Sequence, residues 1–243
     1  MTADGADPAD AVGRTGPPSE LGPLVFVDDV DAPVLHPDDD HHLRRALRLR
    51  PGDEATVSDG AGRWRPVRLG APGTDVEPMG EVVTVTRPSP PVGVAFAPVK
   101  GQRPELVVQK LTELGVDQIR PFHAARSVVR WDGARAESAH TRLQRVAREA
   151  AMQCRRAWLP DLLPIADFAA VAALPGASLA DRLGGRPSLA TPTVIIGPEG
   201  GWSPDERAAS LPVVGLGDPV LRAETAAITA AVLLTALRAG LVH

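Results

Sequence analysis

A glycine-rich turn at residues 195–206, with the sequence IIGPEGGWSPDE, is the part of the chain best suited to bind a ligand. The β-branched and apolar residues 193–196 before it predict a buried strand. Ser203, Pro204 and Glu206 after it fit the N-cap, the first position and the capping-box partner of a helix. The three glycines in between let the backbone turn sharply or approach a flat ligand closely. Because open α/β sheets bind ligands beyond the carboxyl ends of their strands, we expect a binding site here; a tight turn without a ligand is the alternative.

A second glycine-containing turn, GLGDPVLRAETA at residues 215–226, follows the next apolar run. It resembles the start of a dinucleotide-binding fingerprint, but Val220 takes the third small position and no acid follows about twenty residues later. No Walker lysine follows a glycine-rich loop and no nucleophile elbow occurs, which excludes these nucleotide and hydrolase classes. The six His residues lack the spacing of metal ligands, so we expect no metal. The two turns could instead surround a flat, largely apolar cofactor.

The segment 137–156 predicts a helix with two distinct stripes. The apolar stripe, which we expect to face the core, consists of Leu143, Val146, Ala147, Ala150 and Cys154. The polar stripe beside it consists of Arg142, Arg145, Glu149, Gln153 and Arg156. It fits a solvated face with i,i+4 pairs and equally a face for a phosphate-bearing substrate.

The basic residues are unevenly distributed. Residues 1–40 carry ten acids and one Arg, a net charge of −9, whereas the remaining 203 residues carry +5 of the total of −4. Segment 41–68 contains seven Arg and segment 126–156 contains eight. Arginine binds phosphate bidentately, so these clusters favour a polyanionic partner. The ratio of 24 Arg to 2 Lys also fits a GC-rich genome, so the clustering carries more weight than the ratio.

Composition restricts the class of protein further. Hydrophobic content of 44% in 243 residues is typical of a globular protein with one or two domains. The single cysteine, Cys154, excludes an intrachain disulfide and suits the cytoplasm, and the first residues lack a secretory signal. The longest apolar run, 226–237, is too short to span a membrane. With no Tyr and eight other aromatics, the chain is not expected to form an RNA-stacking platform of the RRM or OB type.

These features lie in three predicted regions. Residues 1–20 predict a disordered acidic tail, and residues 21–88 a small β-rich domain with a helix at 41–50. A proline-rich linker at 87–91 leads to residues 92–243, where strands and helices alternate as in an α/β domain with a largely parallel sheet. The strands are expected at 92–99, 116–122, 177–180, 193–196 and 212–216, and the helices at 104–115, 137–156, 203–210 and 223–238.

The last helix is apolar almost all the way round over residues 224–238. A helix on the surface would have a polar face, so this one is expected to be buried in the core or against a second subunit.

In several ordered motifs the sequence resembles the RsmE family, which belongs to the SPOUT class of methyltransferases. The motifs cover about residues 21–240, and together they are specific where each alone is weak. They are His41-His42-Leu43 with Arg48, Pro51-Gly52-Asp53, Asp59-Gly60, Lys100 with Glu105, KLTELGV at 110–116, Arg126-Ser127, Glu149-Ala150 with Gln153 and Arg156, IGPEGG at 196–201, and Leu216-Gly217 with LRAETA at 221–226.

The resemblance implies methylation of uridine N3 in 16S ribosomal RNA of the small subunit, with S-adenosylmethionine as the donor. It also implies a PUA-like N-terminal barrel that binds RNA, a SPOUT α/β domain with a trefoil knot, and a homodimer. Pro219 and Ala223 depart from the residues that the family often has in the last cofactor loop. A non-catalytic RNA-binding assembly factor and a SPOUT enzyme acting on tRNA are the alternatives.

The family's site residues carry over onto matching positions here. The cofactor residues would be Ile196, Gly197, Glu199, Gly200, Gly201, Leu216, Gly217, Val220, Leu221 and Thr225. The motifs, taken together with the Arg cluster of 41–68 and the polar stripe of 137–156, give the expected RNA-binding residues His42, Arg44, Arg45, Arg48, Arg126, Arg142, Arg145, Glu149, Gln153 and Arg156. Arg222 would stabilise charge that develops on the uracil carbonyls, or would simply bind phosphate. Glu224 is a candidate general base, although an acid at a helix start more often interacts with the helix dipole.

Overall fold

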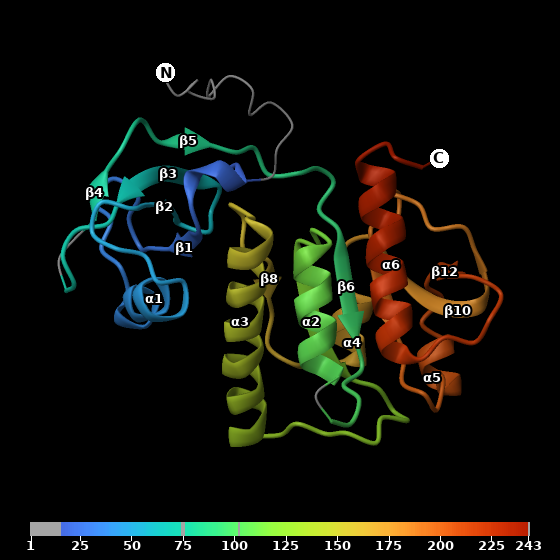
Figure 1. Cartoon of the computed structure of the whole chain (residues 1–243). Coiled ribbons are helices and arrows are strands. Elements are labelled where there is room, and N and C mark those ends of the chain that lie inside the picture. Colours follow the sequence, from blue (N-terminus) through green and yellow to red (C-terminus); the bar gives the residue numbers. More distant parts are fainter. Residues whose placement is uncertain (1–15, 74–75, 102, 243) are drawn as a thin grey trace. The chain divides into compact units, whose positions relative to one another are not determined.

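The computed structural model describes residues 16–73, 76–101 and 103–242 of the chain. The chain divides into two compact units, one formed by residues 1–88 and 151–159 and the other by residues 89–150 and 160–243 (Figure 1). The division after Pro88 falls in the expected linker, but the return of 151–159 to the first unit was not expected from the sequence. Residues 1–15 of the expected disordered tail lie outside the described residues, whereas its last residues, 16–20, are ordered, since Pro17 is buried and Ser19 begins a short helical segment.

The first unit is built on a small five-stranded sheet. Its strands are β1 (Leu24–Phe26), β2 (Glu54–Ser58), β3 (Arg63–Arg68), β4 (Glu77–Pro78) and β5 (Val83–Thr84). β1 pairs with β2 in parallel, and the other pairs, β2 with β3 and β3 with both β4 and β5, are antiparallel. Apolar side chains from the strands and from Leu43 form its core, which includes Val25, Val57, Val67 and Leu69.

The described part of the first unit also contains three short helical segments: η2 (Ser19–Leu21), α1 (Pro37–His41) and η3 (His42–Ala46). Helical structure therefore begins four residues before the predicted 41–50, because Pro37 takes a first-turn position and the His36 side chain accepts a hydrogen bond from the backbone N of Asp38. It ends earlier, at Ala46.

Arg155 explains why the segment 151–159 belongs to this unit. Its guanidinium donates hydrogen bonds to the carbonyl oxygens of Pro17 and Gly22 and to Thr56 Oγ1. Trp158 Nε1 likewise donates to the carbonyl oxygen of Val85 at 2.9 Å. Burial lowers the pKa of Arg155, so these bonds stabilise a cation that has lost part of its hydration.

The second unit is an α/β domain around a parallel sheet in the order β12-β10-β11-β6-β7-β8, with β9 also paired to β7. Every recorded pairing in this sheet is parallel, which confirms the predicted fold class. The strands are β6 (Gly93–Phe96), β7 (Gln118–His123), β8 (Asp161–Leu162), β9 (Ala166–Asp167), β10 (Ala177–Gly185), β11 (Thr193–Ile196) and β12 (Val213–Val214). β8, β9 and the helix α4 were not predicted. The trefoil knot stays a prediction.

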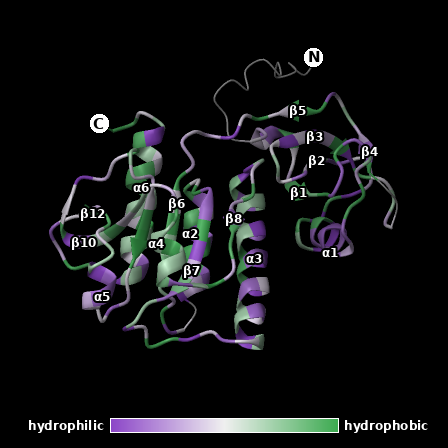
Figure 2. Cartoon of the chain, turned by 180° about the vertical axis from the view of Figure 1, so that it is seen from behind, coloured by the Kyte–Doolittle hydropathy of each residue, from purple (hydrophilic) through white to green (hydrophobic). Residues whose placement is uncertain are grey.

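This unit contains the helices α2 (Arg103–Glu113), α4 (Phe168–Ala172), α5 (Pro204–Arg207) and α6 (Ala223–Arg238), and α3 (Ala134–Cys154) as far as Ala150. The central strands are hydrophobic, and α3 alternates apolar and polar positions along its length (Figure 2). Leu143, Ala147 and Ala150 of its predicted apolar stripe are buried. No helix in the described part of the chain is long and apolar enough to cross a membrane.

The last helix, α6, buries one face rather than its whole circumference. Ala227, Ala230, Ala231 and Leu234 are completely buried in the core of the second unit. Val232, on another side of the helix, is 43% exposed. Burial in the core therefore accounts for one face of α6, and burial of its other side against a second subunit stays a prediction.

Candidate active site

The turn after β11 has the local structure that its sequence predicts. Ser203 Oγ accepts a hydrogen bond from the backbone N of Glu206 at 3.2 Å, and Glu206 Oε2 accepts one from the backbone N of Ser203 at 2.7 Å. This capping box, with Pro204 at the start of the helix, fixes the point at which α5 begins. The chain between Ile196 and Ser203 must then reverse within a few residues, and Gly201 does so at a φ of +69°.

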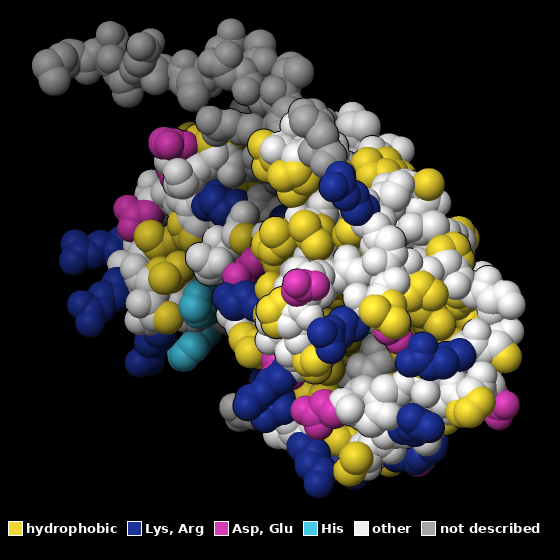
Figure 3. Space-filling model, turned by 90° about the vertical axis from the view of Figure 1, so that its right-hand side faces the viewer, with side chains coloured by type: hydrophobic (Ala, Val, Ile, Leu, Met, Phe, Trp, Pro, Cys, Tyr) yellow, Lys and Arg dark blue, Asp and Glu magenta, His cyan; other side chains and the backbone are white. Residues whose placement is uncertain are grey.

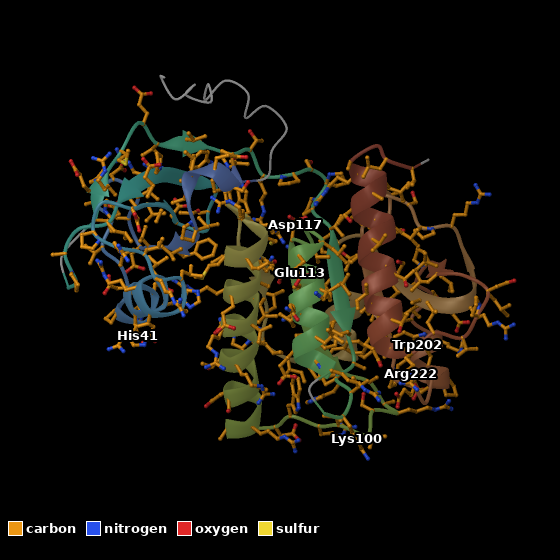
Figure 4. The ribbon with its side chains drawn as sticks, in the orientation of Figure 1. His41, Lys100, Glu113, Asp117, Trp202 and Arg222 are labelled. Carbon is orange, nitrogen blue, oxygen red and sulfur yellow. The ribbon has the colours of Figure 1, made fainter. Side chains whose placement is uncertain are left out.

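A pocket lies beyond the carboxyl ends of β11 and β12 and beside the middle of β10. Segments following β11 and β12 and part of β10 form its walls, so both glycine turns contribute. Eight of the ten predicted cofactor residues line it: Ile196, Gly197, Glu199, Gly201, Leu216, Gly217, Val220 and Leu221. Figure 4 shows Trp202 and Arg222 at this end of the unit, and Glu113 and Asp117 toward the other end of α2.

Two of the predicted cofactor residues do not line the pocket. A Cβ atom on Gly200 would lie 3.1 Å from the Cβ of Arg126, so Gly200 faces Arg126 instead. Thr225 is exposed on α6, whereas its neighbour Ala226 reaches the pocket. The sequence motif could not separate these positions, because the direction of each residue depends on backbone geometry inside the motif.

The third wall of the pocket was missed by the sequence motifs. Ala180, Asp181 and Arg182 come from β10, in the region of the chain where the resemblance is weakest. Arg207 of α5 also lines the pocket, and its Nη2 lies 2.9 Å from Asp181 Oδ2. This ion pair joins β10 to α5 at the edge of the pocket.

Trp202 fixes the distance between two of these walls. Its side chain is buried, and its Nε1 donates a hydrogen bond to the carbonyl oxygen of Ala180 at 2.9 Å. The ring stacks on Phe122 with centroids 6.3 Å apart. A Cβ atom on Gly197 would lie 2.9 Å from the Trp202 ring, so glycine at 197 makes room for this tryptophan. The indole thus holds β10 beside the glycine turn.

The two predicted catalytic residues occupy the start of α6, next to the pocket. Arg222 is the N-cap residue of α6 and is exposed, and Leu221 and Ala223 on either side of it line the pocket. The Glu224 side chain is 13% exposed and lies 3.7 Å from Arg103, measured from Oε1 to Nε. Arg103 Nη1 also lies 3.3 Å from Glu199 Oε1, so one guanidinium connects the two cofactor turns. The catalytic roles themselves stay predictions.

The polar stripe of α3 is only partly available for RNA. Arg142, Arg145, Glu149 and Gln153 are exposed, but Arg142 Nε lies 2.6 Å from Glu105 and Arg145 Nε lies 3.6 Å from Glu149. Arg156 lies past the end of α3 and is 6% exposed. The inclusion of Arg156 in an exposed RNA-binding stripe is therefore wrong. Because the helix ends at Cys154, helical periodicity does not predict on which side Arg156 lies.

Several Arg residues of segment 41–68 have partners within the first unit. Arg44 Nε lies 2.7 Å from Asp40 and its Nη2 donates to the carbonyl oxygen of Gly70 at 3.0 Å, so this predicted RNA contact is half-buried. Arg63 pairs with Asp31 at 2.6 Å, and this hydrogen bond raises the pKa of Arg63. The predicted RNA-binding residues His42, Arg45 and Arg48 remain exposed.

A parallel sheet with a pocket formed by glycine turns at its strand ends, together with a separate small β-rich unit, defines a two-domain α/β protein with a ligand-binding site. A family model described as RNA methyltransferase domain matches residues 87–235, and one described as RNA methyltransferase PUA domain matches residues 37–75. The chain belongs to this RNA methyltransferase family.

Its relatives include a "Ribosomal RNA small subunit methyltransferase E" from Mycobacterium tuberculosis, 33% identical over 81% of this chain and 83% of the relative. One from Bacillus subtilis is 29% identical over 78% of this chain and 84% of the relative. A crystal structure of a ribosomal RNA small subunit methyltransferase E from Neisseria gonorrhoeae, bound to S-adenosyl methionine, has a TM-score of 0.77 at 28% identity. The similarity covers 88% of this chain and 97% of that one.

Proposed function

We infer that this protein is an S-adenosylmethionine-dependent methyltransferase that acts on 16S ribosomal RNA of the small subunit, at N3 of a uridine. The observation that carries the inference is the pocket at the ends of β10, β11 and β12, whose turns belong to the matched methyltransferase domain. The Neisseria gonorrhoeae relative binds S-adenosyl methionine, and the curated relatives are named for small-subunit ribosomal RNA.

The residues of the pocket suit this cofactor. Ile196, Leu216 and Leu221 supply apolar walls for a flat ring system. Gly201 and Gly217 have φ angles of +69° and +130°, and no atom lies within 4 Å of a Cβ built on Gly201. The backbone can therefore approach a ligand at Gly201 without a side chain in between. S-adenosylmethionine supplies an electrophilic methyl group on a sulfonium.

The protein's own task is mainly to position the acceptor and to balance charge, because in-line displacement requires alignment of the reacting atoms. Uridine N3 carries a proton at neutral pH, so a base must take this proton before or while N3 attacks the methyl group. Negative charge develops on the uracil carbonyls as the proton leaves. Arg222, exposed beside the pocket, would stabilise the charge that develops on the uracil carbonyls. Glu224 lies nearby as a candidate base, paired with Arg103.

The role of Arg222 is tested with Arg222→Met and Arg222→Lys. Loss of an electrostatic stabiliser lowers kcat by roughly 100-fold or more, with the affinity for S-adenosylmethionine unchanged. The Lys variant should recover part of kcat. If Arg222 only binds phosphate, the Met variant raises KM for RNA and keeps kcat.

We also propose that the protein is a cytoplasmic homodimer. The outer side of α6 supports the dimer: Val232 is 43% exposed, and Ile228 and Ala236 lie on the same side at i,i+4 spacing. Contact with a second copy would cover this apolar surface. The single cysteine suits a reducing compartment.

The substrate is tested by mass spectrometry of nucleosides from a strain that lacks the gene. We expect N3-methyluridine to disappear from 16S ribosomal RNA and to return with the wild-type gene. If the modification is lost from transfer RNA instead, the protein is a methyltransferase with another target. If no modification is lost but subunit assembly is impaired, the protein is an assembly factor.

A further inference from the structure

A basic hollow adjoins the cofactor pocket on the surface of the second unit. It is formed by residues just before and at the start of α2, by residues after β7, and by the turn after β11. Lys100, Arg103 and Arg126 line it, together with Pro198 and Glu199. Pro198 and Glu199 also line the cofactor pocket, so the two cavities share the Pro198–Glu199 wall. Figure 4 places Lys100 at the same end of the unit as Trp202 and Arg222.

The charges in this hollow are not balanced. Glu199 is the one acid among its lining residues, and its Oε1 lies 3.3 Å from Arg103 Nη1. Among the described residues, no carboxylate is recorded as a partner of Lys100 or of Arg126. The Arg126 guanidinium donates to the carbonyl oxygen of Gly200 at 3.2 Å and is otherwise exposed. Two cations therefore remain available to an anion in the same hollow.

A second hollow continues the basic surface toward α3. It shares Val99, Lys100 and Val129 with the first hollow and adds Arg135, Ser138 and Arg142. Cationic side chains thus follow one another from the wall of the cofactor pocket to the exposed side of α3. Figure 3, seen from the right-hand side of Figure 1, shows Lys and Arg side chains on the lower part of that side as well, with Asp and Glu side chains among them. A surface that presents cations in a row suits a phosphate backbone better than a single small anion.

We propose that the hollow of Lys100, Arg103 and Arg126 binds a phosphodiester of the RNA strand beside the nucleotide to be methylated, and that Arg135 binds the next part of that strand. This site adds an RNA-binding surface to the proposed function, and the identification of the bound nucleic acid as RNA rests on that function. The shared Pro198–Glu199 wall would set the distance between the bound phosphate and the cofactor. Arginine and lysine both bind phosphate oxygens through charge-assisted hydrogen bonds.

The proposal is tested on the full-length protein with Lys100→Ala, Arg126→Ala and the double variant. Affinity for a 16S ribosomal RNA transcript is measured over a range of salt concentrations, and affinity for S-adenosylmethionine is measured by calorimetry without RNA. Each single variant should weaken RNA binding about 5- to 10-fold and reduce the salt slope by up to about one. Affinity for S-adenosylmethionine should be unchanged.

Arg130→Ala is the matched control, because Arg130 is an exposed cation of the same loop that lines neither hollow. It should change RNA affinity less than Arg126→Ala does, and Lys100→Arg should restore the affinity lost in Lys100→Ala. The proposal is overturned if the double variant binds RNA as the parent does at every salt concentration. It is also overturned if S-adenosylmethionine affinity falls instead, since the anion would then be the carboxylate of the cofactor. A parent protein that binds this RNA but methylates none of it would contradict the proposed function and leave the phosphate site standing.

Discussion

Glu206 Oε1 accepts a hydrogen bond from the backbone N of Ala125 at 2.8 Å. The same carboxylate closes the capping box of α5 through its other oxygen, Oε2. Glu206 is 4% exposed, so it ties the end of the cofactor turn to the loop that carries Arg126. The cofactor pocket and the basic hollow beside it are thereby positioned by one buried side chain.

We predict that Glu206→Ala lowers the free energy of unfolding by about 2–4 kcal/mol, because two backbone N–H groups lose a charged acceptor. Asp205→Ala is the control, since Asp205 is an exposed acid in the same helical turn. It should cost only about 0.5 kcal/mol through the helix dipole. Urea unfolding monitored by circular dichroism measures both variants. Equal destabilisation by the two substitutions would show that Glu206 has no special role.

Trp202→Phe should weaken S-adenosylmethionine binding about 5- to 10-fold, because the wall formed by Ala180 loses its hydrogen bond to the indole. Trp158→Phe removes an equivalent indole hydrogen bond, to Val85, in the first unit. This control should lose a similar amount of stability and keep its affinity for the cofactor. Calorimetry gives the affinities and thermal unfolding gives the stabilities. Similar cofactor affinity in both variants would mean that Trp202 does not shape the pocket.

The features that the sequence predicts well are local ones. Ser203, Pro204 and Glu206 define the start of α5 because a capping box involves residues three apart. The strand at 193–196 and the parallel sheet follow from continuous apolar runs alternating with helices. The family motifs place eight of ten cofactor residues on the pocket for the same reason, since each motif is one continuous turn.

The features that the sequence does not predict depend on contacts with other parts of the chain. From the sequence, Arg44 is predicted to be a free surface cation, but in the structure it binds Asp40 and the carbonyl oxygen of Gly70. No sequence motif identifies Asp181, because its role depends on the fold, which places β10 beside α5 so that Asp181 pairs with Arg207. Gly200 belongs to a cofactor motif but faces Arg126 because of the turn's geometry. Periodicity and spacing contain no information on such tertiary contacts.

Arg45 and Arg48 should contribute to RNA binding, whereas Arg44 should contribute to stability. Arg45 and Arg48 are exposed, so the double variant to Ala should weaken binding and flatten the salt slope by up to about two. Arg44→Ala should lower the free energy of unfolding and leave the salt slope nearly unchanged, because its guanidinium is already paired. Filter binding at several salt concentrations separates the two effects. A salt slope reduced by Arg44→Ala alone would reverse this assignment.

Val232→Glu should convert the proposed homodimer into a monomer, because it places a charge on the exposed apolar side of α6. Val34→Glu is the control, since Val34 is an exposed valine of the first unit. Light scattering at micromolar concentration gives the mass of each variant. A parent protein with the mass of a monomer and full activity would refute the dimer.

The most direct test of the account is transfer of a labelled methyl group from S-adenosylmethionine by the purified protein to small ribosomal subunits from a strain that lacks the gene. We expect label in 16S ribosomal RNA, located at N3 of a uridine by nucleoside analysis, and slower transfer by Trp202→Phe when the cofactor is limiting. Absence of label from this RNA, under conditions in which the protein binds S-adenosylmethionine, would contradict it.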